Sequence, residues 1–334
     1  MNIAIVKLSS LGDVIHTLPV ASALRTAFPD ARLTWVVEAR ESAILRDHPA
    51  LDGIVAVDTR RWRRAVWSPR GAGEVTRELS RLRRTMSAAR FDVAIDLQGL
   101  IKSGLLTAAT GARLRIGFSA LRCWEPLNAA FTTHRVTPPI SARHVIDQYC
   151  SLLAPLGVER PEVSFTVPRS AAAEARIDAF FAAEGIKARD RVVALVPGAR
   201  RPNKRWPVFH FRRLADRLSA DSGARVIVVW GPDEQPLARS IAAGLWSRPV
   251  MAPPTNLDEL TALVRRCSVL VGGDTGPIHL AAAVGAPAVG LFGPTPADRN
   301  GPYGPKGRGV QSPDGLMASI DPDTVFDAIV EFLS

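Results

Sequence analysis

Short runs of β-branched and aliphatic residues alternate with amphipathic helical stretches along both halves of this 334-residue chain. Such alternation is typical of parallel sheets that are covered by helices on both faces. We therefore predict an α/β protein built from two Rossmann-like domains that face each other across a cleft. The predicted strands are Ile3–Val6, Leu33–Val37, Ile54–Val57, Val93–Leu97, Arg115–Phe118, Val192–Val196, Val226–Trp230, Val269–Val271 and Ala288–Phe292.

The segment between the two halves is predicted to connect the domains. It contains Pro161 and Pro168, and a helical pattern follows from Ala171 to Ala183. Prolines interrupt regular elements, and the charge balance of the chain also shifts here. We expect a first domain at 1–155, a connection with a helix at 156–190, a second domain at 191–315, and a C-terminal helix within 316–334.

The length and composition of the chain allow two hydrophobic cores and give no sign of a membrane-spanning segment. Hydrophobic residues make up 47% of the sequence, but no apolar run approaches the ~20 residues that cross a bilayer, so we expect a soluble or peripheral protein. Three cysteines without pairing or metal spacing favour a reducing cytoplasm. The apolar run at Ile3 begins so early that we expect no targeting signal before it.

Positive charge is concentrated in the first half of the chain. Residues 1–150 hold 21 Lys and Arg against 13 Asp and Glu, whereas the remainder holds 21 against 19. Ten arginines and two acids lie within residues 60–90. The first half is therefore expected to meet an anionic partner, such as nucleic acid, an acidic membrane, or a phosphorylated or carboxylated substrate. A solvated arginine-rich face is the alternative.

A carboxylate, Asp13, follows the first predicted strand where a dinucleotide-binding protein would have glycines. In open α/β sheets, ligands bind outside the carboxyl ends of the strands. The turn holds Ser9, Ser10 and Gly12 but no G-x-G-x-x-G, which argues against a nicotinamide-dependent oxidoreductase. We predict a site for a ligand with hydroxyl groups, and a helix-start acid is the alternative. His16 lies one turn later, where a packed histidine is at least as compatible.

The second half repeats the order of strand, glycine-rich turn and helix. The turn runs from Gly272 to Gly276, and His279 lies one helical turn beyond Thr275. Free N–H groups at a helix start favour phosphate, whereas Asp274 is placed to accept hydrogen bonds from sugar hydroxyls. The alternative is that Asp274 or Thr275 caps the helix while His279 packs in the core.

A basic loop follows the first predicted strand of the second half. Four cations lie between Pro197 and Pro207, and one of them, Lys204, is among only five lysines in the chain. A lysine can follow a phosphate whose charge grows as a bond breaks. A solvated basic loop is the alternative. Gly293 and Thr295, at the end of a further strand, are expected to line the same cleft.

No metal and no cofactor are expected. The chain lacks the G-x-x-x-x-G-K-[ST] phosphate loop. Asp321 and Asp323 look like the acid pair that holds a metal in some sugar-transferring enzymes. However, they directly precede the final predicted helix, Thr324–Leu333, so capping explains them better.

Taken in order, these elements resemble the ADP-heptose:lipopolysaccharide heptosyltransferases, over nearly the full length of the chain. The ordered set is specific, although no single motif is. Its members are the Lys-x-Ser-Ser-x-Gly-Asp turn ending at Asp13, Arg60-Arg61-Trp62-Arg63-Arg64, Asp96-Leu-Gln98-Gly99-Leu-Ile-Lys102-Ser103, Arg122-x-x-Glu125-Pro126, Lys204-Arg-Trp-Pro and Asp274-Thr-Gly-x-x-His279.

The resemblance implies a GT-B fold and an inverting, metal-independent glycosyl transfer. The first domain would bind the acceptor, the second would bind the nucleotide sugar, and the final helix would pack back on the first domain. Heptose would pass from ADP-L-glycero-β-D-manno-heptose to the Kdo of Kdo2-lipid A. The enzyme would be cytoplasmic and peripherally associated with the inner membrane.

The resemblance also implies roles for individual residues. Asp13 would be the general base, and Lys204 would meet the charge of the leaving diphosphate. The implied donor-binding residues are Asp274, Thr275, Gly276, His279, Gly293 and Thr295. The implied acceptor-binding residues are Ser10, Arg60, Arg61, Arg63, Arg64, Gln98, Lys102, Arg122 and His144.

Two other functions stay open at this point. Another member of the same family, such as the enzyme that adds the second heptose, would share the donor motifs and differ in its acceptor residues. The Arg60–Arg64 cluster favours an acceptor dense in negative charge. A non-enzymatic basic module would need interleaved aromatics, of which only Trp62 and Trp67 are present, and no nucleic-acid partner is expected.

Overall fold

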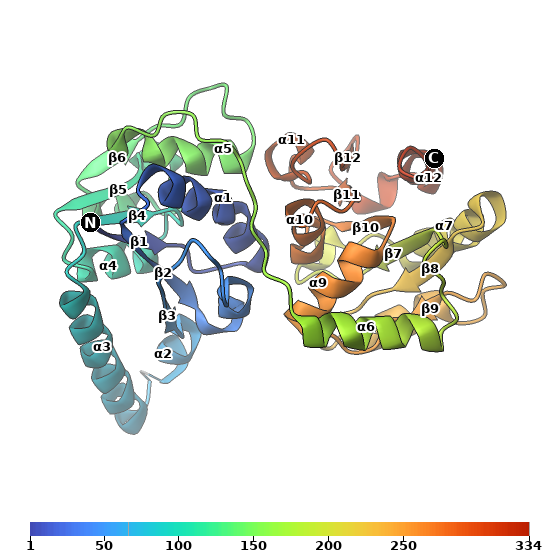
Figure 1. Cartoon of the computed structure of the whole chain (residues 1–334), viewed down its shortest axis with the longest axis horizontal. Coiled ribbons are helices and arrows are strands. Elements are labelled where there is room, and N and C mark those ends of the chain that lie inside the picture. The colour runs from blue at the N-terminus through green and yellow to red at the C-terminus, as the bar shows by residue number, and fades with distance from the viewer. Residues whose placement is uncertain (66, 334) are drawn as a thin grey trace. The chain divides into compact units, whose positions relative to one another are not determined.

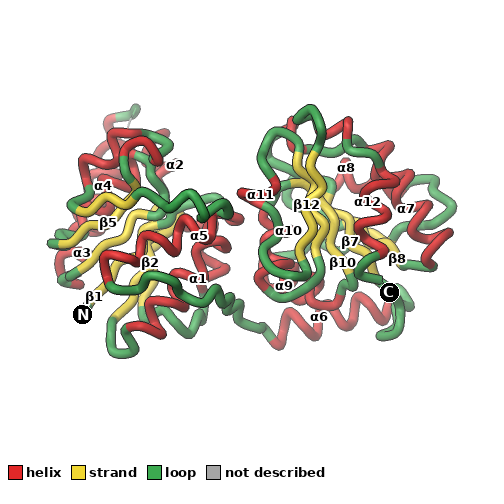
Figure 2. Tube along the Cα trace, turned by 90° about the horizontal axis from the view of Figure 1, so that it is seen from above, coloured by secondary structure: helices red, strands yellow, loops and turns green. Residues whose placement is uncertain are grey.

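The computed structural model describes residues 1–65 and 67–333, which form two compact units. The first unit is Met1–Thr166 and the second is Val167–Ser334. Each unit contains one six-stranded parallel sheet with its covering helices (Figure 1, Figure 2). The predicted α/β class with two Rossmann-like domains is confirmed.

The first sheet has the strand order β3-β2-β1-β4-β5-β6. All neighbouring strands are parallel, and Ile5 on the central strand lies between Trp35 and Ile95 on its two neighbours. The strands are β1 (Asn2–Val6), β2 (Arg32–Glu38), β3 (Gly53–Val57), β4 (Val93–Asp96), β5 (Leu114–Phe118) and β6 (His134–Val136).

Helices cover both faces of the first sheet because its central strands are buried on both sides. Ala4 and Val6 pack against Met86 and Leu106 on one face. Successive strand residues point to opposite faces, so the fully buried Ile3 and Ile5 belong to the other face. The helices are α1 (Leu11–Ala27), η1 (Ala39–Leu45), α2 (Thr59–Ala65), α3 (Pro69–Ala89), α4 (Ile101–Ala109), η2 (Ala120–Arg122), η3 (Pro126–Phe131), α5 (Val145–Cys150) and η4 (Ser151–Leu156).

The second sheet has the order β12-β11-β10-β7-β8-β9, which is the same topology as the first. Its strands are β7 (Val192–Val196), β8 (Arg225–Val228), β9 (Val250–Met251), β10 (Val269–Gly273), β11 (Ala288–Phe292) and β12 (Gly307–Gln311). Its helices are α6 (Ala171–Ala183), η5 (Pro202–Lys204), α7 (Val208–Ser222), α8 (Gln235–Ala242), α9 (Leu257–Arg266), α10 (Gly276–Ala283), α11 (Ala297–Asn300), η6 (Met317–Ser319) and α12 (Pro322–Val330).

The second unit has two cores, one on each face of its sheet. Val193 and Leu195 of β7 join the core that includes α7, α8 and α12. Val192 and Ala194, the alternate residues of the same strand, join the core that includes α6, α9 and α10. This period of two explains why the strand appears in the sequence as a continuous apolar run.

The strand order reverses between β1 and β4 in the first sheet and between β7 and β10 in the second. In a doubly wound sheet, the loops at such a point diverge and leave a crevice outside the carboxyl ends of the strands. The loops that leave β1 and β4, and those that leave β7 and β10, carry predicted catalytic and substrate-binding residues. The topology therefore places the two loops of each pair on either side of one crevice within their unit.

Three strands, β6, β9 and β12, were not predicted from the sequence. Each lies at an edge of its sheet. Edge strands are short and partly exposed, so they lack the apolar run that marks a central strand. β6 is largely exposed and β9 has only two residues. Conversely, the predicted Val226–Trp230 strand ends at Val228.

The C-terminal helix α12 belongs to the second unit. Its apolar residues fill the second unit's core, with Val325 and Ile329 fully buried. Arg217 of α7 also stacks over the Phe326 ring at 3.9 Å.

Membrane-spanning helices are not found among the described residues. None of their helices is both long enough and apolar enough to cross a bilayer. Helix α3, with 21 residues, contains five arginines. This agrees with the lack of a long apolar run in the sequence.

His48, in the loop before β3, makes the stability of the first unit sensitive to pH. Burial of the imidazole lowers the pKa of His48 to about 4, against an opposing contribution from the Thr166 backbone. The unfolded chain binds a proton near the ordinary histidine pKa of 6.5, so stability is fully present above that pH and is lost as pH falls toward 4. The loss is on the order of 3 kcal/mol, from about 1.4 kcal/mol per pKa unit.

We expect His48→Asn to flatten this dependence. The His48 Nδ1 accepts a hydrogen bond from the Ala50 N–H at 3.2 Å, and the asparagine oxygen can replace that acceptor. Urea unfolding of both proteins at pH 7 and pH 4.5 measures the effect. If both proteins lost the same unfolding free energy between pH 7 and pH 4.5, His48 would not be the source of the pH dependence.

Candidate active site

Asp13 lies in the first turn of helix α1 and is held by the residues that precede it. Its Oδ2 accepts hydrogen bonds from the backbone N–H and the hydroxyl of Ser10, both at 2.9 Å. A carboxylate that reaches back to the N-cap N–H forms one half of a capping box, so the helix-start interpretation is part of its role. The side chain is still 36% exposed, and a ligand can reach it.

A buried lysine lies behind Asp13. Lys7 is 2% exposed, and its ammonium donates to the Leu97 carbonyl at 2.8 Å and to the Tyr149 hydroxyl at 2.7 Å. The ammonium is 3.9 Å from Asp13 Oδ1, and the Tyr149 hydroxyl donates to the same oxygen at 3.4 Å. The carboxylate therefore offsets the buried positive charge, and both of its oxygens are oriented.

Gln98 positions the turn that leads to Asp13. Its side-chain oxygen accepts hydrogen bonds from the backbone N–H groups of Leu8 and Ser9, at 3.0 and 3.1 Å. The side chain is 8% exposed. These hydrogen bonds give Gln98 a supporting role in the turn, and its side-chain NH2 is not part of them.

Asp96 in turn fixes the segment that carries Gln98. Its Oδ1 accepts from the N–H groups of Gln98 and Gly99, at 2.9 and 3.1 Å. Its Oδ2 accepts from the Ser103 hydroxyl and the Asn128 amide, at 2.9 and 2.7 Å. Burial raises the pKa of Asp96 even though these hydrogen bonds favour the charged form. This fully buried network joins β4, α4 and η3.

Lys102 lies at the same carboxyl edge of the sheet and pairs with a buried acid. Its ammonium is 3.3 Å from Glu38 Oε1 and 3.2 Å from the Thr59 hydroxyl. Glu38 is 2% exposed and also accepts hydrogen bonds from the Thr59 hydroxyl and N–H. Lys102 itself is 38% exposed, so it reaches solvent as well as its partner.

The predicted acceptor-binding arginines lie at the surface. Helix α2 buries none of its side chains, and Arg60, Arg61, Arg63 and Arg64 are all exposed. Arg61 pairs with a glutamate of α3. Arg122, in η2 after β5, is exposed as well. These guanidinium groups are accessible to an anionic ligand.

His144 and His16 have structural contacts that the sequence could not separate from a binding role. His144 is the N-cap of α5, and its Nδ1 accepts a hydrogen bond from the Ile146 N–H at 3.2 Å. Its ring meets that of His16 edge-on, with centroids 5.6 Å apart. His16 is 3% exposed, which matches the packed histidine weighed above.

In the second unit, three predicted site residues meet at Asp274, which is itself a predicted donor-binding residue. Lys204 donates to its Oδ2 at 2.5 Å, and the Thr295 hydroxyl donates to the same oxygen at 2.9 Å. His279 Nε2 lies 3.0 Å from Oδ1. These residues come from η5, from the loop after β11 and from α10, so the tertiary fold assembles the cluster.

The cluster keeps Asp274 ionised. Burial alone would raise the pKa of Asp274, whose side chain is 7% exposed. The hydrogen bonds and charges of His279 and Lys204 act in the opposite direction and hold the pKa well below its usual range. A buried carboxylate in this state is a strong acceptor for hydroxyl groups.

Glycines near this cluster allow the chain's own loops to pack closely. A Cβ at Gly273 would lie 2.6 Å from the carbonyl oxygen of Lys204, and one at Gly293 would lie 2.9 Å from the sulfur of Met317. Gly273 and Gly293 therefore allow close internal packing of these loops.

The start of α10 follows directly. Thr275 is its N-cap, and Gly276 is its first residue. The Thr275 hydroxyl donates to the Gly273 carbonyl at 3.2 Å. Thr275 therefore holds the N-cap position, as the alternative interpretation predicted, although its side chain makes no capping hydrogen bond. The first N–H groups of α10 follow Asp274 directly in the chain.

The loop that carries Lys204 is anchored on both sides. The Arg205 guanidinium donates to the Ala199 carbonyl at 2.8 Å, and the indole of Trp206, 3% exposed, donates to the Ile320 carbonyl at 3.0 Å. A Cβ at Gly198 would overlap the carboxylate of Glu234, so that acid lies directly over the loop. Glu234 was not predicted from the sequence, because no motif marks it.

The described residues contain no group of three or more His, Cys, Asp or Glu that could hold a metal. Asp321 is the N-cap of α12, but its side chain makes no capping hydrogen bond. Asp323 pairs with Arg213 and Arg217, at 2.7 and 2.6 Å. Ion pairing accounts for this acid better than capping does.

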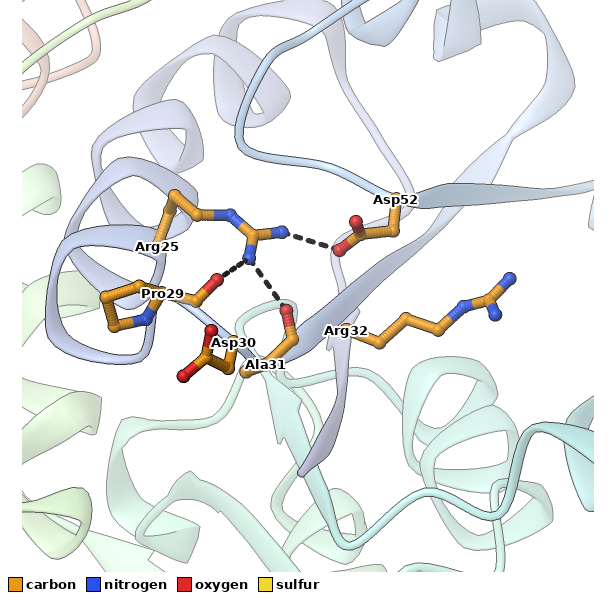
Figure 3. A pocket seen from close by; sticks show the side chains of 6 residues that line it. All are labelled: Arg25, Pro29, Asp30, Ala31, Arg32 and Asp52. Carbon is orange, nitrogen blue, oxygen red and sulfur yellow. Dashed lines mark hydrogen bonds and ion pairs between the residues drawn. The ribbon is translucent and has the colours of Figure 1, made fainter.

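A surface hollow lies at the amino ends of the strands of the first sheet. It has a volume of about 450 Å³ and is lined by residues at the end of α1 and the amino ends of β2 and β3 (Figure 3). Arg25 fills its polar side by donating to the Pro29 and Ala31 carbonyls and to the Asp52 carboxylate. These contacts tie α1 to the sheet, and the hollow is remote from the carboxyl ends where Asp13 lies.

Each unit thus assembles part of the predicted site. Ser10, Asp13 and Gln98 converge after β1 and β4. The arginines of α2 follow β3, the outermost strand on one side of that sheet. Lys204, Asp274, His279 and Thr295 converge in the second unit. Tyr149 was missed, because it reaches Asp13 from 136 residues away.

The chain is similar to known proteins in sequence and in structure. The model of glycosyltransferase family 9 (heptosyltransferase) matches residues 79–328. The chain is 30% identical over 333 residues to lipopolysaccharide heptosyltransferase 1 of Salmonella typhimurium, covering 98% of this chain and 100% of that protein. It is 33% identical over 305 residues to the protein of the same name from Pseudomonas aeruginosa, covering 91% and 82%.

A solved structure extends the likeness to three dimensions. The E. coli heptosyltransferase WaaC with ADP superposes with a TM-score of 0.81 at 28% identity, covering 99% of this chain and 100% of that one. The GT-B fold class that the motifs implied is thereby confirmed. Because the family model matches most of the chain and full-length relatives reach 30% identity, this chain belongs to glycosyltransferase family 9, the heptosyltransferases.

Proposed function

We propose that this glycosyltransferase is a heptosyltransferase I. It transfers L-glycero-D-manno-heptose from ADP-heptose to the Kdo of Kdo2-lipid A in the lipopolysaccharide inner core, with inversion. The observation that carries the proposal is the accessible, oriented Asp13 carboxylate at the switch point of the first sheet. The names of the relatives from Salmonella and Pseudomonas support the choice of heptosyltransferase I within the family.

Asp13 acts as the general base in this proposal. An inverting displacement needs one group to take the proton from the attacking hydroxyl. Ser10 holds one oxygen of Asp13 from the turn, while Lys7 and Tyr149 lie on the side of the other. This arrangement fixes the direction of the carboxylate before the acceptor arrives, which lowers the cost of ordering it during the reaction.

Lys204 and the start of α10 meet the leaving diphosphate. Hydrolases protonate a departing alkoxide with a second carboxyl group, whereas a diphosphate departs readily when its growing charge is met. Lys204 pairs with Asp274 in the structure, and a diphosphate would draw its ammonium away. Asp274, with His279 and Thr295, would then accept hydrogen bonds from heptose hydroxyls.

The first unit binds the acceptor in this proposal. Exposed arginines of α2 and Arg122 suit bidentate contacts with Kdo carboxylates and lipid A phosphates. Lys102 and His144 complete the acceptor set. An acceptor built on lipid A is held in a membrane, so we place the enzyme peripherally at the cytoplasmic face of the inner membrane. No nucleic-acid partner is proposed.

The alternative within the family is heptosyltransferase II or another enzyme with a different acceptor. It would use the same Asp13 and Asp274 chemistry. A non-enzymatic basic module gives no reason for an oriented carboxylate at the switch point, or for the ion cluster around Asp274. The acceptor therefore decides between the remaining functions.

We expect Asp13→Asn to lower kcat by about 10²- to 10⁴-fold, because general-base catalysis contributes that much. The asparagine oxygen can still accept the Ser10 N–H, so folding and ADP-heptose binding are expected to persist. Turnover with Kdo2-lipid A and calorimetric binding of ADP-heptose measure the two effects. Near-normal turnover would exclude Asp13 as the base.

Lys204→Ala is expected to lower kcat by about 10²-fold, since a positioned cation at a developing charge contributes at this scale. Lys187→Ala is the matched control, because Lys187 is an exposed lysine of the same unit outside the site. Steady-state release of ADP compares the variants. Equal rates for the two would remove Lys204 from the reaction.

An acceptor panel tests the function as a whole. We expect ADP release from ADP-heptose with Kdo2-lipid A and with its deacylated form, and little with a core that already carries heptose. The same rates are expected in excess EDTA. Preference for the heptosylated core would replace the proposal with heptosyltransferase II, and loss of activity in EDTA would show a required metal.

A further inference from the structure

Large apolar side chains stand in solvent on the loops that follow β5 and β6. Leu121 is 97% exposed, Trp124 75%, Leu127 69% and Ile140 94%. None of them contributes to the cores of the first unit. Single exposed apolar residues are ordinary, but several of this size on neighbouring loops mark an interaction surface. We call these four residues the apolar tip.

The two loops of the apolar tip leave adjacent strand ends. Phe118, the last residue of β5, pairs with Val136, the last residue of β6. Directly beyond them, the hydroxyl of Thr137 donates to that of Ser119 at 2.9 Å. Both loops therefore start from one point, beside α5 in the first unit (Figure 1).

The charge around the apolar tip is positive. Within residues 119–144, Arg122, Arg135 and Arg143 are exposed, and Glu125 is the one acid. The Glu125 carboxylate accepts a hydrogen bond from the Ile101 N–H at 2.6 Å, so it is used to hold the start of α4. Arginine beside exposed tryptophan and aliphatic side chains is the pattern of proteins that enter the interface of an anionic bilayer.

The position of the apolar tip favours a membrane over a protein partner. β5 and β6 end at the same edge of the sheet as β1, whose loop carries Asp13. At the opposite end of that edge, after β3, Trp67 is 85% exposed and follows the arginines of α2. Basic and apolar groups thus flank the Asp13 turn on both sides.

We propose that the apolar tip inserts into the headgroup layer of a bilayer that carries anionic lipids and holds the carboxyl edge of the first sheet toward it. The inference rests on the proposed function in one respect, namely that the acceptor is anchored in that bilayer. Insertion places the loops beside the acceptor while its sugar reaches Asp13. No covalent step is involved.

Vesicle binding of the full chain tests the surface without any sugar nucleotide. The test protein is the triple variant Leu121→Ser, Trp124→Ser and Ile140→Ser. The matched control is Phe209→Ser with Trp246→Ser, two side chains of the second unit that are 64% and 65% exposed. All are surface positions, so thermal unfolding is expected to stay close to that of the parent.

We expect the parent and the control to co-sediment with vesicles of phosphatidylethanolamine and phosphatidylglycerol, and to bind phosphatidylcholine vesicles more weakly. The triple variant is expected to bind the anionic vesicles at least about tenfold more weakly, because it loses the inserted apolar area. Equal binding by the triple variant and the parent would overturn the proposal. So would an equal loss in the control.

Two further measurements separate this inference from the proposed function. With ADP-heptose, the triple variant should match the parent on the deacylated acceptor and fall behind on Kdo2-lipid A embedded in vesicles. Absence of transfer by the parent to every acceptor would refute the proposed function, while vesicle binding would still decide the surface. If gel filtration shows that the triple variant only breaks a dimer and binds vesicles normally, the apolar tip is a contact between two copies and the proposal is wrong.

Discussion

The reversal of strand order beside β1 and beside β7 decides where the functional side chains of this protein lie. The chain passes from β1 to β2 on one side and returns later to β4 on the other side. In the same way, it passes from β7 to β8 and returns later to β10. The loops after β1 and β4, and after β7 and β10, therefore diverge at the carboxyl ends. Asp13 and Gln98 meet at the first of these points, and Lys204 and Asp274 at the second. Without this topology, neither cluster would form.

Both clusters are already ordered by hydrogen bonds within the protein. Asp13 is oriented by its own N-cap residue, Ser10, and by Lys7 and Tyr149 behind it. Asp274 is oriented by partners that also keep it charged. Such preorganisation means that the two carboxylates need little reorientation when a substrate binds. It also means that the Asp13 carboxylate can cap its helix and serve as the proposed general base, because its two oxygens have different neighbours.

The sequence predicted best those features that depend on neighbours along the chain. Buried central strands show as apolar runs, and a strand–turn–helix order marks the loops that carry Asp13 and Asp274. Edge strands such as β6 and β12 escaped prediction, because partial exposure removes the apolar signal. The amide oxygen of Gln98 accepts hydrogen bonds from Leu8 and Ser9, and a contact of that kind leaves no local pattern in the sequence.

The amino-acid order determined the fold class, the order of the elements and the residue types at each loop, since hydrophobic periodicity and turn chemistry are local properties. Only the tertiary structure decided which of those residues share a site. Tyr149 reaches Asp13 from α5, Lys204 and Thr295 reach Asp274 from separate loops, and α12 packs on α7. These pairings join residues far apart in the chain. They depend on how helices pack on a twisted sheet, and sequence spacing does not encode that geometry.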